Sequence, residues 1–404
     1  MRLLLATHKL GRGGSESYLI AVASELQRLG HVVTVHGVED GPSSERLRAL
    51  GIDVAVGETP PAGDFDAALV QDTGRSYAIA RQLPATGQVF VAHSELFDAQ
   101  LPPQDGSVAT VVALNDRVER RIRALAAPPP LVRLTQPIDC ARFAVRETIR
   151  ARPRRAIVLS NYLHGARVDL LRRAWEPSGV ELTMIGEEGQ PSDAPELAIA
   201  DADIVVAKGR ALLEGMASSR ACYLFDMAGC DGWVTPDAYP ALEADAFAGQ
   251  ATERAATFEA LRDDLVRYRP EMGTANRDLV TAKHNVRHHA ERLVELLAAA
   301  APDPAADAVG LTEQDRLARA QWRLEDRSAG LTRENDHLHA RIVEIEADRE
   351  GLRTACTKLE RERDDWRARA EQLERDDRDL RATRRYRLAT ALGRPLDALR
   401  GARR

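Results

Sequence analysis

The sequence predicts an α/β protein of two domains, each built on a parallel sheet with helices on both faces, followed by a long C-terminal α-helical coiled coil. Short apolar runs alternate with segments of helical spacing over roughly the first 300 residues, which is the pattern of strands buried on both sheet faces. Further along, apolar residues recur at every seventh position, as in a coiled coil. The length of 404 residues also exceeds what one core supports.

The first domain is expected over residues 1–135. Its apolar runs and helical segments alternate up to a proline-rich stretch. Parallel sheets bind ligands where the carboxyl ends of their strands meet helix N-termini, so we expect a site at that edge. The expected strands span residues 3–6, 31–37, 67–70, 89–92 and 108–114, and the expected helices span residues 15–29, 44–50, 74–83 and 116–125.

The second domain is expected over residues 136–298. It opens with a polar, arginine-rich connector at 136–153, after which the alternation of strands and helices resumes. Two such halves joined by a linker leave a cleft between them. The expected strands span residues 156–159, 180–185, 204–206 and 221–225, and the expected helices span residues 168–175, 211–217, 251–268 and 276–300.

A proline-containing linker is expected at 299–312, and the coiled coil at 313–380. Besides the apolar row given at the end of this paragraph, a second row of positions four residues later is mixed in polarity and contains Asn335. Asn335 favours a parallel homodimer, because a buried asparagine is best paired with the same asparagine of the partner helix. The alternative is a single solvated, charged helix. The row at seven-residue spacing is Leu317, Leu324, Leu331, Leu338, Ile345, Leu352, Leu359, Trp366, Leu373 and Leu380.

The tail, residues 381–404, combines eight arginines and a single acid, Asp397, with leucines at near-helical spacing. A basic amphipathic segment of this kind is suited to peripheral contact with an anionic membrane surface. The alternative is a frayed, solvated end of the coil.

Composition excludes several classes of protein. A net charge of -6 and 4% aromatic residues argue against a nucleic-acid-binding protein. The four cysteines are far apart in the sequence, without the spacing of a zinc site or a disulfide framework, which fits a reducing cytoplasm. The sequence contains no run of eighteen apolar residues, so it predicts no membrane span.

Two glycine-containing turns at predicted strand ends could hold a diphosphate. The first places Gly13 and Gly14 just before a helix, where backbone N–H groups and the positive helix end can face an anion. It lacks the spacing of a Walker loop or a dinucleotide fingerprint, and a plain flexible turn would look the same. The second, Lys208-Gly209-Arg210, adds two cations at another helix start.

Glu214 lies about one turn into the helix that follows the basic turn. We expect its carboxylate to accept hydrogen bonds from ribose hydroxyls. The alternative, an ordinary acid on a helix surface, is disfavoured by the apolar neighbours Leu212, Leu213 and Met216.

Five short segments occur in an order that resembles one enzyme family. They are Gly13-Gly14-Ser15-Glu16, Leu29-Gly30-His31-Val32-Val33, Val91-Ala92-His93, Pro137-Ile138-Asp139-Cys140-Ala141-Arg142-Phe143 and Leu213-Glu214-Gly215-Met216-Ala217. The family is that of nucleotide-sugar glycosyltransferases of the GT-B fold, family four. The resemblance covers roughly residues 1–297 and leaves the coil outside it.

The resemblance implies two Rossmann-like domains that face a cleft, an N-terminal one on the acceptor side and a C-terminal one that binds the donor. It places the two glycines beside the donor phosphate and acceptor, gives His93 a catalytic place beside the reacting sugar, and implies retention at the anomeric carbon. Without the resemblance, His93 would be interpreted as a hydrogen-bonded histidine at a strand end.

The sequence also departs from the family pattern. Of a pair of glutamates eight positions apart it keeps only Glu214, because the other position is a valine. Where the family has an arginine and then a lysine, Asn161 occupies the arginine position and Arg167 is the nearest cation for the lysine role. Lys208 and Arg210 could supply the missing positive charge.

Two further segments leave their interpretation open. The segment Gly229–Asp237 falls where the family has a loop near the donor sugar, and it equally fits a turn anchored by Trp233. His284, His288 and His289 lie on a predicted helix without a metalloprotease motif, so we interpret them as a polar face packed at the domain junction.

The first hypothesis is therefore a glycosyltransferase that moves a sugar from a nucleotide-diphosphate sugar to a carbohydrate or lipid-linked acceptor, in cell-surface polysaccharide synthesis. We expect no metal ion and no cofactor, because no aspartate cluster calls for one. The alternatives are a catalytically inactive, nucleotide-sugar-binding scaffold dimerised by its coil, and a nucleotide-sugar epimerase on the same fold. The expected location is the cytoplasm, with peripheral contact to the inner membrane surface.

Overall fold

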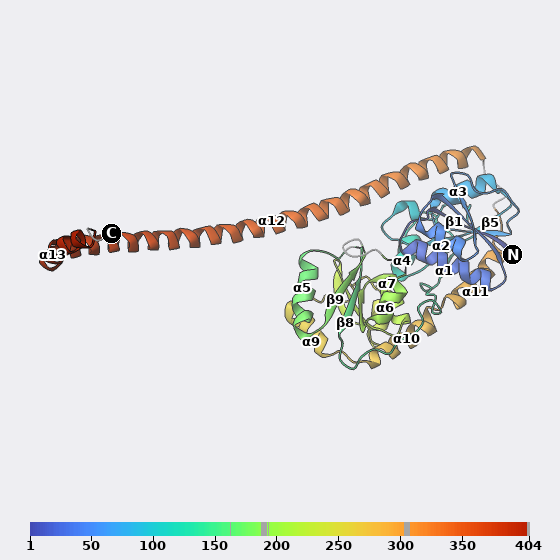
Figure 1. The fold of residues 1–404 in the computed structure, drawn as a ribbon. Coiled ribbons are helices and arrows are strands. Elements are labelled where there is room, and N and C mark those ends of the chain that lie inside the picture. Colours follow the sequence, from blue (N-terminus) through green and yellow to red (C-terminus); the bar gives the residue numbers. More distant parts are fainter. Residues whose placement is uncertain (162, 187–191, 193, 303–307, 402–404) are drawn as a thin grey trace. The chain divides into compact units, whose positions relative to one another are not determined.

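The computed structural model describes residues 1–404 except 162, 187–191, 193, 303–307 and 402–404. The chain divides into two compact units, Met1–Gly330 and Leu331–Arg404. The first unit holds two sheets with their covering helices and the beginning of the long helix α12 (Figure 1).

The first sheet has seven parallel strands in the order β3-β2-β1-β4-β5-β6-β7. The central strands β1 and β4 are almost entirely buried, which explains their apolar sequences. The strands are β1 (Arg2–Lys9), β2 (Val32–Glu39), β3 (Asp53–Val56), β4 (Ala67–Val70), β5 (Gly87–Ala92), β6 (Thr110–Ala113) and β7 (Leu131–Arg133).

Alternate side chains of β1 pack on opposite faces of this sheet. Leu3 and Leu5 pack with α1 and α11, whereas Leu4 and Ala6 pack with α3 and α4. Helix α11 comes from the far end of the α/β region and returns to cover the first sheet. The helices are α1 (Gly14–Arg28), α2 (Pro42–Ala49), α3 (Thr73–Gln82), the 3-10 helix η1 (Asp98–Gln100), α4 (Asp116–Arg123) and α11 (Val286–Ala299).

The second sheet has five strands in the order β12-β11-β10-β8-β9, in which β12 is antiparallel to β11 and the others are parallel. Helices α5 and α9 cover one face, and α6, α7 and α10 the other (Figure 1). The strands are β8 (Arg155–Leu159), β9 (Glu181–Ile185), β10 (Ile204–Ala207), β11 (Ala221–Asp226) and β12 (Gly229–Trp233). The helices are α5 (Ala166–Trp175), η2 (Glu176–Ser178), α6 (Pro195–Asp201), α7 (Gly209–Ala217), α8 (Tyr239–Ala244), α9 (Phe258–Val266) and α10 (Glu271–Lys283).

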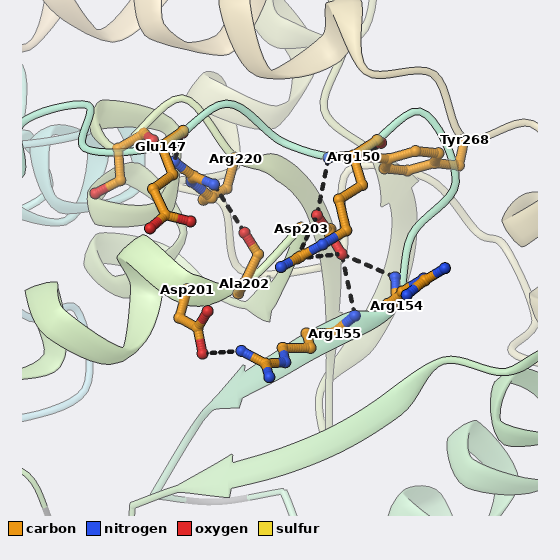
Figure 2. Close-up of polar contacts among 10 residues, drawn as sticks. Glu147, Arg150, Arg154, Arg155, Asp201, Ala202, Asp203, Arg220 and Tyr268 are labelled. Carbon is orange, nitrogen blue, oxygen red and sulfur yellow. Dashed lines mark hydrogen bonds and ion pairs between the residues drawn. The ribbon is translucent and has the colours of Figure 1, made fainter.

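The arginine-rich connector is held to the amino edge of the second sheet by Asp203, which precedes β10 (Figure 2). Its buried carboxylate accepts hydrogen bonds from the backbone N–H groups of Arg150, Arg154 and Arg155 at 2.9, 2.8 and 3.1 Å. Burial opposes ionisation, but these hydrogen bonds hold the pKa of Asp203 below its usual value. The cluster lies at the edge opposite the carboxyl ends of the strands, so it orders the connector.

Two expected helices differ in the structure. The helix expected at 276–300 is two helices, α10 and α11, because the first helix ends before His284. The Asn285 side chain caps α11 by accepting a hydrogen bond from the Arg287 N–H. The helix expected at 251–268 is shorter and begins after Thr257, whose side chain accepts a hydrogen bond from the Ala260 N–H.

Helix α12 (Ala308–Ala382) begins before the predicted start of the coil at 313, inside the predicted linker, of which residues 303–307 lie outside the described residues. Helix α13 (Arg384–Gly401) follows it. The α/β class with two sheets and a long C-terminal helix is therefore confirmed. Pairing of that helix with a second chain stays a prediction, and so do the predicted domain boundaries.

Candidate functional site

The first unit contains a pocket of about 310 Å³ that brings together the carboxyl ends of both sheets. Its walls come from the turns after β1, β5 and β6 and from the start of α7 after β10. Of the predicted site residues, Gly14, His93, Gly209 and Arg210 line it. The described residues that line it are Gly14, Ser15, His93, Ser94, Glu95, Leu96, Leu114, Asn115, Arg117, Val118, Gln136, Gly209, Arg210, Leu213, Glu243, Ala246, Phe247, Ala248 and His284.

In the first glycine turn, a side chain at position 13 would be crowded, whereas a side chain at position 14 would have open space. A Cβ on Gly13 would lie 2.5 Å from Oε2 of Glu16, so a larger residue would displace that carboxylate. A Cβ on Gly14 would meet no described atom within 4 Å. Gly14 therefore leaves the start of α1 accessible to a ligand in the pocket, as expected for a turn that faces an anion.

His93 follows β5 and presents a neutral imidazole to the pocket. Its ring packs edge-on against Tyr18, with 4.8 Å between the ring centroids. Burial, with smaller contributions from the nearby Arg210 and His289, lowers the pKa of His93 to about 3. The buried Nε2 has no hydrogen-bond partner among the residues that the structure describes. This nitrogen is therefore suited to exchange a hydrogen bond with a ligand hydroxyl.

Two of the three clustered histidines lie at the junction between the sheets, as expected. His289 Nε2 lies 2.8 Å from the Tyr18 hydroxyl, and His284 Nε2 lies 2.7 Å from the Tyr239 hydroxyl. The third, His288, is exposed. Within the described residues, no group of three or more His, Cys, Asp or Glu side chains is arranged to hold a metal ion.

Arg210 and Glu214 form a buried ion pair on α7. Arg210 Nε lies 3.0 Å from Oε1 of Glu214, and its Nη1 donates to the Pro137 carbonyl at 2.7 Å. Burial raises the pKa of Glu214 and lowers that of Arg210, although each partner opposes the shift of the other. Arg210 therefore occupies Oε1 of Glu214, and the expected contact of this carboxylate with ribose hydroxyls stays a prediction.

Lys208 and Arg167 converge on Asp226, the last residue of β11. Lys208 Nζ lies 2.9 Å from Oδ1 of Asp226, and Arg167 donates to the Asp226 carbonyl through Nη2 at 2.8 Å. Ser160 donates to the other carboxylate oxygen at 2.7 Å. These two cations are not among the described residues that line the pocket; they meet at the carboxyl edge of the second sheet.

Gly209 occupies a backbone conformation that glycine favours, with φ of 55°. Its N–H donates to the Phe247 carbonyl at 2.8 Å. The turn is therefore stabilised by the protein itself, and Gly209 contributes shape to the pocket wall.

Sequence reasoning missed Asp226 as a site residue. The available signal was an acid directly after the apolar run of a predicted strand, at the edge where parallel sheets bind ligands. The Trp233 segment begins with β12, whose last residue, Trp233, donates from Nε1 to the Asp264 carbonyl at 2.8 Å. Trp233 therefore anchors an edge strand, and a place of the segment near the donor sugar stays a prediction.

No family model matches the chain, and no curated protein matches its sequence. Among solved structures, the chain is similar to Anabaena HepE in complex with UDP and glucose, with a TM-score of 0.54 at 14% identity over 74% of this chain and 99% of that one. The UDP-glucose complex of HepE matches with a TM-score of 0.51 at 14% identity, over 74% of this chain and 100% of that one.

This likeness, together with the two sheets and the pocket at their carboxyl ends, identifies the fold as GT-B, as the motif resemblance implied. At such low identity the likeness defines the fold, and the roles of the individual site residues rest on the geometry above.

Proposed function

We propose that the protein is a glycosyltransferase that moves a sugar from a nucleotide-diphosphate sugar to a carbohydrate or lipid-linked acceptor. The observation that carries this proposal is the convergence of Gly14, His93 and Arg210, from the two sheets, on one pocket. HepE, which shares the fold, binds UDP and UDP-glucose. The pocket of this chain is suited to a donor of that kind.

The chemical demand on such a site is to stabilise negative charge as it grows on the departing diphosphate. Arg210 and the open start of α1 at Gly14 supply positive potential at the pocket, and Lys208 and Arg167 supply it at the neighbouring sheet edge. One preorganised donor of this kind contributes about 10²–10³ in rate. Asp226 orients both Lys208 and Arg167, because each bonds to it.

His93 is the proposed catalytic residue beside the reacting sugar. Its low pKa keeps the imidazole neutral at physiological pH, so it adds no positive charge next to a sugar that becomes cationic in the transition state. Its Nε2, to which none of the described residues bonds, can instead fix the orientation of a sugar hydroxyl. We expect transfer with retention and without a metal ion.

A nucleotide-sugar-binding scaffold without turnover is the second candidate. The observation that favours it is the missing glutamate: position 206 is a valine inside β10, fully buried in the core, and Glu214 is paired with Arg210. Such a site would bind the donor through the same pocket and leave its glycosidic bond intact.

The test is to mix the full-length protein with UDP-glucose and other nucleotide-diphosphate sugars, with and without EDTA, and to measure nucleotide binding, UDP release and the sugar product. Arg167→Ala should lower turnover by about 10²-fold. The matched control is Arg172→Ala on the same helix, whose guanidinium is exposed and lies 3.9 Å from Glu176. Binding without release supports the scaffold, and a changed sugar still attached to nucleotide indicates an epimerase.

We also propose that α12 pairs with a second copy of the chain. The predicted row of apolar side chains is exposed along the whole helix, from 53% at Leu338 to 69% at Leu324. A regular exposed row of this kind is costly in water and is covered by an identical row in a parallel dimer.

The basic tail is proposed to contact an anionic membrane surface. Arg381, Arg384, Arg385 and Arg387 are exposed, as are Leu388 and Leu392 on α13. The side chains from residue 393 onward, which include the remaining predicted arginines and leucines, lie outside the described residues. Across the described part of the chain, none of the helices is both long and apolar enough to span a bilayer.

A further inference from the structure

The first turns of α12 pack against the first sheet and its helices. Five side chains of α12 at alternating spacings of four and three residues share one helix face. Leu311, Asp315 and Ala318 of this set are buried, and Trp322 and Glu325 are partly buried. We call residues 311–326 the docked segment. The apolar row of the predicted coil starts here too, but its Leu317 and Leu324 are exposed.

Asp315 fixes the register of the docked segment. Its carboxylate is fully buried and lies 3.4 Å from the guanidinium of Arg81 and 3.9 Å from that of Arg75, which is itself fully buried. Arg319, one turn on, donates to Asp315 at 2.7 Å. A buried carboxylate requires such partners, so a shift of the helix by one turn would leave charges unpaired.

The next turn of the docked segment reaches the strand end that leads into the first glycine turn. Trp322 stacks on the ring of His8 near the end of β1, with centroids 4.6 Å apart and an interplanar angle of 28°. Lys9 Nζ lies 3.9 Å from the Asp326 carboxylate. The Lys9 side chain also runs beside Gly11, because a Cβ there would lie 3.5 Å from it.

The same turn reaches the loop that follows His93. Glu325 accepts a hydrogen bond from the Ala99 N–H at 3.2 Å. Residues 94–96 of this loop line the pocket, and Leu96 and Phe97 present exposed apolar side chains beside it. The turn after β1 and the loop after His93 are therefore held by one helix.

We propose that the docked segment positions the loop after His93 on the acceptor side of the site, so that it determines acceptor use. This inference rests on the proposed function, because it assumes transfer at the pocket. The exposed Leu96 and Phe97 beside polar pocket residues suit an amphiphilic acceptor, in which a sugar hydroxyl is joined to an apolar group. Trp322, Asp315 and Glu325 act through the two loops and are positioning residues.

The test uses the full-length protein, UDP-glucose as donor, and octyl glucoside and free glucose as acceptor probes. Trp322→Ala should raise the KM for octyl glucoside by about 10- to 100-fold, the effect of a misplacement of about 1 Å, and this change should exceed the change in the Kd for UDP. Trp322→Phe should restore the KM, because it keeps a ring against His8. Asp315→Asn should act like Trp322→Ala, and the exposed Asp348→Asn on the same helix is its control.

Hydrogen exchange of residues 94–101 gives a second readout that needs no acceptor. Trp322→Ala should speed exchange in this loop, and Trp322→Phe should not. Wild-type KM values together with wild-type exchange in Trp322→Ala would overturn the inference. A wild-type protein that releases UDP but glucosylates glucose as well as octyl glucoside would overturn the amphiphilic acceptor. Absence of nucleotide-sugar binding in the wild type would instead defeat the proposed function, and the exchange data would still decide the role of the docked segment.

Discussion

Replacing Glu214 by glutamine should destabilise the protein, because it leaves the guanidinium of Arg210 buried without a countercharge. Both side chains are at most 10% exposed and lie 3.0 Å apart. Burial shifts the pKa of each toward its neutral form, which indicates that the cost of removing both charges from water is large. Removing one partner of such a pair costs about 3–5 kcal/mol in unfolding free energy.

The decisive variant is the double replacement Arg210→Met with Glu214→Leu. Because it removes both buried charges and keeps side-chain volume, its unfolding free energy should lie within about 1 kcal/mol of the wild type or above it. Each single change of this cycle, Arg210→Met or Glu214→Leu, should be less stable than the double variant. The double variant should also bind UDP more weakly, since Arg210 lines the pocket.

Urea unfolding followed by tryptophan fluorescence measures this cycle. Trp175 and Trp233 are buried in the core of the second sheet and report on the part of the chain that contains the pair. If the loss of unfolding free energy in the double variant equals the sum of the losses in the two single variants, the pair is not coupled. If the single variants unfold within about 1 kcal/mol of the wild type, the pair is not buried as described. Either result would refute the reasoning.

Four other outcomes are expected. Lys208→Gln should lower the unfolding free energy by about 1–3 kcal/mol because it leaves the Asp226 carboxylate buried without its cation. Adding Asp226→Asn should restore stability without restoring turnover. If the double variant regains turnover, Lys208 has no role in donor chemistry. Ile345→Asp should convert the dimer to a monomer by light scattering, whereas Glu346→Lys should not; a monomeric wild type contradicts the coil. Truncation after Leu380 should abolish salt-sensitive binding to anionic vesicles, to which each cation contributes about 1 kcal/mol, and unchanged binding would exclude the tail. The unfolding free energy should fall as pH decreases from about 6.5, the ordinary pKa of histidine, because buried neutral histidines with lowered pKa values must take up protons on unfolding. Each of these histidines contributes up to about 1.4 kcal/mol per pH unit. A urea midpoint that stays constant between about pH 7 and about pH 5 would contradict this expectation. These histidines are His8, His36 and His284, with a pKa of about 4, and His93 and His289, with a pKa of about 3.

The central strands could be predicted from the sequence because they are buried on both faces. β4 is wholly apolar and buried, and its predicted bounds are those observed. The edge strands β3 and β7 were missed because each pairs on one side and remains partly exposed, so their sequences lack a continuous apolar run. The return of α11 to the first sheet depends on long-range packing that local periodicity does not encode.

The candidate site could be predicted where its signal is local. Glycines and cations at strand-to-helix turns are visible in the sequence, and Gly14 and Arg210 do line the pocket. The partners of these residues are not visible, because Asp226 meets Lys208 only after the sheet has formed. The docked segment was also missed: its buried face lies between the positions of the conspicuous apolar row, and its pairing of Asp315 with Arg81 links distant parts of the chain.

The most direct test of the central claim is a titration of the purified, full-length protein with UDP-glucose and related nucleotide-diphosphate sugars, followed by analysis of the products. We expect saturable binding that Arg210→Met weakens, with release of the nucleotide diphosphate and transfer of the sugar to an acceptor or to water. Failure of every nucleotide-diphosphate sugar to bind, or binding that Arg210→Met leaves unchanged, would contradict the proposed glycosyl transfer at this pocket.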